Sequence, residues 1–166
     1  MISYTRFIDT PIGKILLESD GESLTGVYFP AQLKQRSRFQ ARPQMSVPLS
    51  CSKLFEQAQS QIEQYFKGER KSFDLAIKPN GTEFQKKVWG ELCKIPFGET
   101  ISYKELAVRC GNKNASRAVG MANSKNPISL IVPCHRVIGE NGSLTGYAGG
   151  LSSKEYLLKL EGAKNN

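Results

Sequence analysis

The sequence predicts two domains, a mixed α/β domain over residues 1–79 and a mainly α-helical domain over residues 80–166. Short strand-like segments separated by turn signals dominate the first half of the chain, whereas the second half begins with amphipathic segments that carry helix-capping residues. Between the two halves, Pro79-Asn80-Gly81 breaks any regular structure. A chain of 166 residues is long enough for two compact domains.

The N-terminal half opens with three segments of strand-like composition, at residues 2–8, 15–19 and 24–29. Turn signals separate them: Thr10-Pro11-Ile12-Gly13 and Asp20-Gly21-Glu22. We therefore expect a small sheet at the start of the chain, with a hairpin at the second turn.

A loop, a helix and a further strand are expected in the rest of this half. Residues 30–50 are polar, basic and proline-containing, which favours a solvated loop over a dedicated binding patch. Within residues 51–66, apolar side chains recur every four positions: Leu54, Ala58, Ile62 and Phe66. This spacing predicts an amphipathic helix. Residues 73–77 alternate between apolar and polar side chains, as a strand does.

Two capping patterns mark helix starts in the C-terminal half. Thr82-Glu83-Phe84-Gln85 has the spacing of a capping box, and Ser102-Tyr103-Lys104-Glu105 repeats it. The second helix is short, and Gly111 can adopt the left-handed conformation that ends it. Residues 115–123 follow and are rich in small side chains, so they can approach another surface closely. This arrangement suggests either a DNA-binding helix-turn-helix or a packed helical hairpin.

A thiol, the single histidine of the protein and an arginine lie together inside the apolar run Ile131–Ile138; they are Cys134, His135 and Arg136. Burying a polar group without a partner costs on the order of 2–7 kcal/mol, so this placement indicates a chemical role. Pro133 cannot donate a ladder hydrogen bond, which favours a strand end or a turn that presents Cys134 to a pocket. An adjacent imidazole can lower the pKa of a thiol and create a thiolate nucleophile. A cysteine that merely packs as a small hydrophobe is the alternative.

The last helix is expected over residues 152–161, with a serine as its N-cap. Glu161 lies at its C-terminal end, where the helix dipole disfavours a carboxylate by about 0.3–1 kcal/mol. Its position therefore suggests that this carboxylate has another partner.

Composition and charge narrow the classes of function. A net charge of +8 at pH 7 favours a polyanionic partner. The sequence has no apolar run of about 18 residues and no signal-peptide pattern, so we expect a cytoplasmic protein without a membrane partner. Four cysteines without CxxC spacing, together with one histidine, argue against a metal site.

Several short motifs follow one another between Gly81 and Gly162: Gly81-Thr82-Glu83-Phe84-Gln85, Ile95-Pro96-Phe97-Gly98, Ser102-Tyr103, Arg117-Ala118-Val119-Gly120, Asn126-Pro127, Pro133-Cys134-His135-Arg136-Val137 and Gly149-Gly150-Leu151. In order and spacing they resemble the O6-alkylguanine-DNA alkyltransferases, also called methylated-DNA–protein-cysteine methyltransferases. Residues 1–79 match this family loosely, in length and strand order. The resemblance implies an RNase H-like sheet in the N-terminal domain and a winged-helix-like helix-turn-helix in the C-terminal domain.

The resemblance also implies a role for each matching residue near Cys134. Cys134 corresponds to the alkyl acceptor, His135 to a base that acts through water, and Glu161 to the acid that orients the imidazole. Asn126 corresponds to the residue that braces the helix-turn-helix against the active-site turn. The expected product is a thioether on Cys134, formed once per molecule and without a cofactor, because the lesion itself supplies the alkyl group.

Further residues match positions that contact DNA or the damaged base. Tyr103 resembles the tyrosine that helps rotate the nucleotide out of the duplex, and Arg117 resembles the finger that fills the vacated space. The loop from Tyr147 to Gly150 is expected to close over the alkylated base. Ala148 stands where some relatives carry a hydroxyl, so the substrate range is expected to differ from theirs. The complete expected set is Tyr103, Arg117, Ala118, Asn123, Arg136, Val137, Tyr147, Ala148, Gly149 and Lys154.

The implied function is direct-reversal repair by a monomer that flips O6-alkylguanine, and also O4-alkylthymine, out of double-stranded DNA. Two other hypotheses stay open at this point. A non-catalytic helix-turn-helix regulator explains the short helices and the positive charge, but it leaves the Cys134–His135 pair unexplained. A cysteine hydrolase would use Cys134, His135 and Glu161, yet the sequence contains no motif for an acyl substrate.

Overall fold

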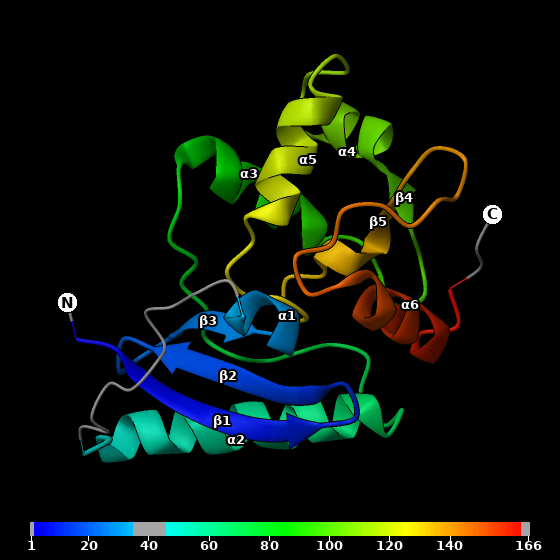
Figure 1. Ribbon diagram of the computed structural model, residues 1–166. Coiled ribbons are helices and arrows are strands. Elements are labelled where there is room, and N and C mark those ends of the chain that lie inside the picture. The colour runs from blue at the N-terminus through cyan, green and yellow to red at the C-terminus, as the bar shows by residue number, and fades with distance from the viewer. Residues whose placement is uncertain (1, 35–45, 164–166) are drawn as a thin grey trace.

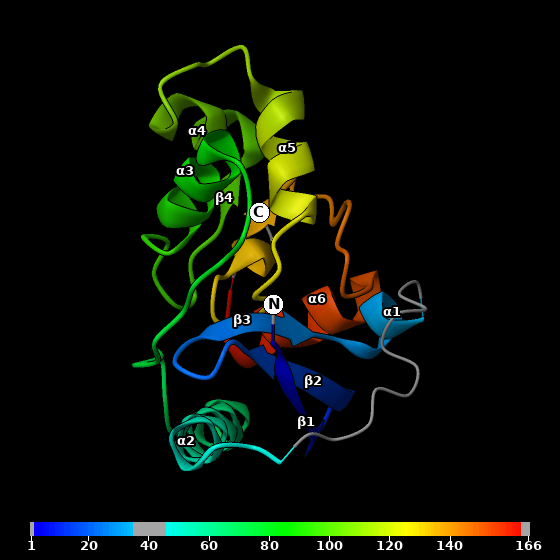
Figure 2. The same cartoon turned by 90° about the vertical axis from the view of Figure 1, so that its left-hand side faces the viewer.

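A three-stranded antiparallel sheet forms the N-terminal part of the computed structural model, which describes residues 2–34 and 46–163 (Figure 1). Its strands are β1 (Tyr4–Thr10), β2 (Gly13–Ser19) and β3 (Leu24–Tyr28), in that spatial order. Helix α2 lies along one face of the sheet, and the C-terminal elements lie over the other (Figure 2). Because both faces are covered, β2 buries apolar side chains at consecutive positions instead of alternate ones. The predicted small sheet is confirmed.

Helix α2 (Leu49–Phe66) confirms the helix predicted over residues 51–66. Its buried face includes Leu54, Ala58 and Ile62, as the four-residue spacing indicates, and it ends on Tyr65. The loop expected over residues 30–50 is wrong at its start, where Pro30–Leu33 forms the short helix α1. Proline suits the first turn of a helix because its fixed φ is helical and its missing N–H needs no partner there. Residues 35–45 of the predicted loop lie outside the described residues.

The strand predicted over residues 73–77 is wrong, because this segment makes one isolated bridge, between Ile77 and Leu24 of β3. The outer edge of β3 is divided between two segments. Leu24 bonds to the chain around Ile77, and Val27 pairs with Ile128 from the C-terminal half. The Val27 amide donates to the Pro127 carbonyl at 2.9 Å, and the Val27 carbonyl accepts from the Ser129 amide at 3.2 Å. Neither segment occupies enough of the edge to form a regular strand.

The C-terminal half begins with helix α3 (Glu83–Leu92), strand β4 (Ile101–Ser102), helix α4 (Tyr103–Arg109) and helix α5 (Ser116–Ser124). The predicted capping box at α3 is confirmed, since Thr82 Oγ1 accepts from the Gln85 amide at 3.1 Å and Gln85 Oε1 accepts from the Thr82 amide at 2.9 Å. Gly111 has φ +89° in the turn after α4, as expected for a helix that ends on a left-handed glycine.

The chain then forms the 3₁₀ turn η2 (Cys134–Arg136), strand β5 (Val137–Ile138) and helix α6 (Leu151–Leu160). Strand β5 pairs in parallel with β4. The serine N-cap predicted for the last helix is wrong. Gly150 occupies that position at φ +95°, a conformation that favours glycine, and the serines fall within the first turn.

Buried apolar residues from both halves pack into one cluster, so the sheet domain and the helical domain share a core. Among the described residues, no helix combines the length and apolarity that a membrane crossing requires. The division between residues 79 and 80 stays a prediction.

Candidate active site

Cys134 is the first residue of the 3₁₀ turn η2, and only 4% of its surface is exposed. Its amide donates to the Val132 carbonyl at 2.8 Å, which closes a tight turn around Pro133. The prediction that a turn presents Cys134 therefore agrees with the structure. Burial raises the pKa of the Cys134 thiol, and Asn126 and Lys154 act in the opposite direction. A thiol in this place needs a base to become a nucleophile at neutral pH.

Asn126 holds the segment that leads to the cysteine. Its Nδ2 donates to the Val132 carbonyl at 2.9 Å, and its Oδ1 accepts from the Ile128 amide at 3.0 Å. Within this segment, Leu130 has φ +75°, a left-handed conformation that is strained for a bulky side chain. The buried Asn126 thus ties the end of α5 to the approach to Cys134, and its bracing role in the reaction stays a prediction.

His135 and Glu161 form a fully buried pair next to the cysteine. His135 Nε2 lies 2.8 Å from Glu161 Oε1, and both side chains have 0% exposure. Burial lowers the pKa of His135, partly offset by the carboxylate. A neutral imidazole that donates from Nε2 keeps Nδ1 as a proton acceptor, and this nitrogen has no hydrogen-bond partner among the described residues. The geometry therefore leaves the basic nitrogen of His135 available.

Arg136 neutralises the carboxylate from a second direction. Its Nε donates to Glu161 Oε2 at 3.0 Å, one Nη to Glu161 Oε1 at 2.9 Å, and the other Nη to the Ile95 carbonyl at 2.6 Å. Burial acts to raise the pKa of Glu161, but the hydrogen bonds from His135 and Arg136 outweigh it and lower that pKa to about 2. Because these donors point inward, the geometry favours Arg136 as a support for Glu161 over the base contact expected from the sequence.

Tyr65 is a site residue that sequence reasoning missed. It comes from α2, and its hydroxyl donates to Glu161 Oε1 at 2.7 Å. The Gly98 amide lies 3.5 Å from the other carboxylate oxygen. The four-residue spacing within α2 assigns Phe66 to the buried face. No feature of the nearby sequence indicates that Tyr65, the residue before it, reaches a carboxylate.

Lys154 and Tyr147 are two further neighbours of the thiol. Lys154 is fully buried, and its Nζ donates to the Val137 carbonyl at 2.6 Å and to the Thr145 carbonyl at 3.1 Å. Burial lowers the pKa of Lys154 to about 8, against the influence of Cys134. Burial also raises the pKa of Tyr147 well above its usual value, and the neighbouring Cys134 adds to this. Val137 is buried in β5, so its contribution here is through its carbonyl.

The loop that contains Tyr147 is fastened at two further points. The Tyr103 hydroxyl donates to the Thr145 carbonyl at 3.2 Å, which links the start of α4 to this loop. Gly149 is buried against Phe29 of the N-terminal half, and a Cβ at this position would lie 2.4 Å from the Phe29 ring. Ala148, between Tyr147 and Gly149 in the chain, is half-buried. Of the predicted lid residues, Tyr147 lies beside the thiol, and closure of the loop over a base stays a prediction.

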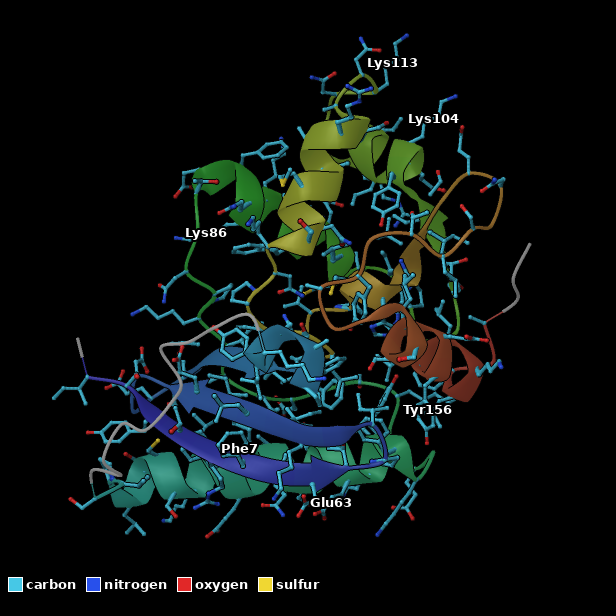
Figure 3. The ribbon with its side chains drawn as sticks, viewed as in Figure 1. Phe7, Glu63, Lys86, Lys104, Lys113 and Tyr156 are labelled. Carbon is cyan, nitrogen blue, oxygen red and sulfur yellow. The ribbon has the colours of Figure 1, made fainter. Side chains whose placement is uncertain are left out.

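Helix α5 presents a different surface. Arg117 and Ala118 are exposed, as a DNA-contacting role requires. Asn123, predicted for the same role, is turned inward, and its Nδ2 lies 3.4 Å from the Cys134 carbonyl. Its geometry favours support of the cysteine turn. Figure 3 shows Lys86, Lys104 and Lys113 extending outward from the helices of the C-terminal half.

Within the described parts of the chain, no group of three or more His, Cys, Asp or Glu side chains could hold a metal ion. The arrangement that is present consists of a thiol, an imidazole and a carboxylate beside an exposed helix with basic neighbours. This is the set of groups that an activated cysteine nucleophile uses.

Comparison with known proteins connects both halves of the chain to one family. Residues 3–79 match the ribonuclease-like domain of 6-O-methylguanine DNA methyltransferase, and residues 83–163 match its DNA-binding domain. A methylated-DNA–protein-cysteine methyltransferase of Methanosarcina acetivorans is 52% identical over 163 residues, covering 96% of this chain and 99% of the relative. A protein of the same name from Mycobacterium leprae is 46% identical, covering 95% and 92%.

A solved structure agrees with these matches. The crystal structure of Mycobacterium tuberculosis OGT in complex with DNA superposes with a TM-score of 0.83 at 45% identity, covering 96% of this chain and 92% of that one. The similarity therefore extends over both halves of the fold.

Proposed function

The chain belongs to the 6-O-methylguanine DNA methyltransferase family, and we propose that Cys134 is the residue that receives the alkyl group. The protein is a methylated-DNA–protein-cysteine methyltransferase that acts in direct-reversal DNA repair, and its partner is DNA. One observation carries the choice of acceptor. Cys134 is the buried cysteine that directly precedes His135 in the chain, and Nε2 of this histidine is hydrogen-bonded to the Glu161 carboxylate.

The chemistry follows from the positions of these groups. His135 Nδ1 accepts the thiol proton through water, and Glu161 stabilises the imidazolium that forms. The Cys134 sulfur then attacks the carbon attached to guanine O6. The C–O6 bond breaks, its electron pair stays on the base, and the proton removed from the thiol restores neutral guanine.

The product explains why one molecule reacts once. A thioether on Cys134 offers no easy leaving group, so the alkyl group stays on the protein. The lesion is the alkyl donor, and the reaction balances without a cofactor. The protein is consumed in proportion to the lesions that it repairs.

Access to the damaged base requires the duplex to open. The O6 atom of guanine is stacked and paired, and flipping the nucleotide costs a few kcal/mol. We assign Arg117 and Ala118 of α5 to the groove and Tyr103 to the flipped nucleotide, with the Tyr147–Gly150 loop closing over the base. The same pocket is proposed to accept O4-alkylthymine. Contacts to phosphate carry little sequence information, so sequence specificity is expected to be low.

We also propose that the protein acts as a monomer in the cytoplasm. All four cysteines are free, as expected in a reducing compartment. Cell fractionation followed by detection of the protein tests the location, and recovery with an oxidising compartment would contradict it.

The experiment that tests the acceptor is the substitution Cys134→Ala. We expect the variant to bind duplex DNA containing O6-methylguanine with unchanged affinity and to transfer nothing. Residual transfer would place the acceptor elsewhere. Wild-type protein that binds DNA but never gains an alkyl group would support the non-catalytic regulator, and turnover on acyl substrates without DNA would support the hydrolase.

A further inference from the structure

Glu161 collects more donors than its pairing with His135 requires. Its Oε1 accepts from Tyr65 at 2.7 Å, from His135 at 2.8 Å and from Arg136 at 2.9 Å. Arg136 also donates to Oε2, and the Gly98 amide approaches that oxygen. All of these donors except Tyr65 belong to the C-terminal half. Tyr65 therefore brings the N-terminal half into direct contact with the acid of the proposed relay.

The tyrosine is held rigidly in place. It is 1% exposed and lies in the last turn of α2. Its ring packs against Phe66, Phe73 and Phe97, with centroid distances of 5.4, 5.5 and 6.1 Å. Burial and the neighbouring carboxylate raise the pKa of Tyr65 strongly, so its hydroxyl remains a donor at all working pH values. A buried hydroxyl needs a partner, and Glu161 is the one it has.

We propose that Tyr65 is a positioning residue for alkyl transfer, which fixes the Glu161 carboxylate in the orientation that supports His135. The proposal rests on the proposed function, in which His135 is the base. Without the hydroxyl, Oε1 keeps two donors, and the carboxylate is free to rotate toward Arg136. The bond to His135 then loses its fixed direction. Tyr65 contacts Glu161 and is assigned no contact with the substrate, so its effect passes through the carboxylate.

Loss of the hydroxyl also changes the charge that His135 experiences. The titratable and charged groups around the imidazole are Glu161 from the end of α6, Arg136 from η2 and Lys154 from α6. The Tyr65 hydroxyl stabilises the negative charge of Glu161. When the hydroxyl is removed, the carboxylate interacts more strongly with the His135 imidazolium. The imidazolium becomes easier to form, so the acidic limb of the pH–rate profile moves to higher pH.

The test is Tyr65→Phe, with Tyr156→Phe as the matched control. Tyr156 lies on the outer side of α6 (Figure 3), is exposed, and packs beside Phe66 at 6.2 Å, so the control removes a hydroxyl from the same neighbourhood without touching Glu161. Rates of transfer are measured with free O6-benzylguanine and with duplex O6-methylguanine, across pH. Each reaction is followed to its endpoint, because loss of folded protein lowers the amplitude and leaves the rate constant of the reacting fraction unchanged.

We expect Tyr65→Phe to slow transfer roughly tenfold on both substrates, to shift the acidic limb upward, and to leave the endpoint and DNA affinity unchanged. The control is expected to match the wild type. A double-mutant cycle with Glu161→Gln sharpens the test, because Tyr65→Phe should then have little further effect. A wild-type rate and profile in Tyr65→Phe would overturn the proposal, as would a full additional loss in the Glu161→Gln background. Failure of the wild type itself to gain an alkyl group on Cys134 would overturn the proposed function instead.

Discussion

The N-terminal and C-terminal halves of the chain meet at the site, but they supply different kinds of group. The C-terminal half contributes the groups that we propose take part in the reaction, namely Cys134, His135 and Glu161. The N-terminal half contributes a hydroxyl from Tyr65 behind the carboxylate and the Phe29 ring behind Gly149. Its strand β3 also bonds to the chain around Ile128, just beyond Asn126. In our proposal, the chemistry belongs to the C-terminal half, and the N-terminal half fixes the geometry in which that chemistry works.

The largest loss of stability and activity is expected from Glu161→Gln. This substitution removes the charged group that contacts both halves of the chain. Arg136 then keeps a buried charge without its counter-ion, and we expect the free energy of unfolding to fall by about 3 kcal/mol. Alkyl transfer should slow roughly 100-fold or more, because His135 loses the group that stabilises its imidazolium. Urea unfolding and single-turnover kinetics measure the two effects. A variant with wild-type stability would show that the carboxylate does not join the halves.

Acid provides a second test of the same carboxylate. The pKa of Glu161 is lowered from 4.5 to about 2, so its contribution to stability is complete above about pH 4.5 and is lost as the pH falls toward 2. We expect the free energy of unfolding to drop by about 3 kcal/mol over this window. The Glu161→Gln variant is the control, since it lacks the titrating group. Equal acid sensitivity in both proteins would assign the drop to other carboxylates.

A smaller effect is expected where the lid loop contacts the N-terminal half. Gly149→Ala places a Cβ 2.4 Å from the Phe29 ring, so one of the two must move. Overpacking of this kind costs about 1–3 kcal/mol of stability, and displacement of Tyr147 should slow transfer.

Gly90→Ala provides the contrast for Gly149→Ala. Gly90 lies within α3 with nothing within 4 Å of the added Cβ, and the change should stabilise the protein by about 0.5–1 kcal/mol. Thermal unfolding of both variants gives the comparison. If both substitutions changed the stability in the same direction, Phe29 would not constrain the position of the loop.

The smallest predicted change in stability belongs to the exposed face of α5. Arg117→Ala should leave the fold unchanged and slow repair of duplex O6-methylguanine roughly tenfold, because the vacated stack is no longer filled. Reaction with free O6-benzylguanine should be affected less, since no duplex has to open. Rates on the two substrates measure the difference. Equal losses would contradict the finger role of Arg117.

The difference between the halves also explains what could be predicted from the sequence. Cys134 and His135 are recognisable because polar, reactive groups inside an apolar run need a reason to be there. Glu161 is recognisable because a carboxylate at the end of a helix is unfavourable without a partner. Tyr65 carries no such signal. It lies 96 residues from Glu161 in the chain, and an aromatic residue on the apolar face of a helix is ordinary.

Two of the predicted DNA-contacting residues show what the sequence could not decide. The resemblance placed Arg136 and Asn123 among the residues that contact DNA or the damaged base. The structure turns both inward, where one satisfies Glu161 and the other approaches the Cys134 carbonyl. Residue type indicates that a polar group needs a partner. Which partner it finds depends on packing between segments that are distant in the sequence. The same packing explains residues 73–77, which share the edge of β3 with the chain around Ile128 and therefore do not form a strand.

The most direct test of the account is the mass of the intact protein after incubation with a duplex containing O6-methylguanine, followed by peptide mapping. We predict the gain of one methyl group per molecule, located on Cys134, with no further gain at excess DNA. A methyl group on Cys51, Cys93 or Cys110, or no gain in mass from reduced and folded protein, would contradict the assignment of Cys134 as the acceptor.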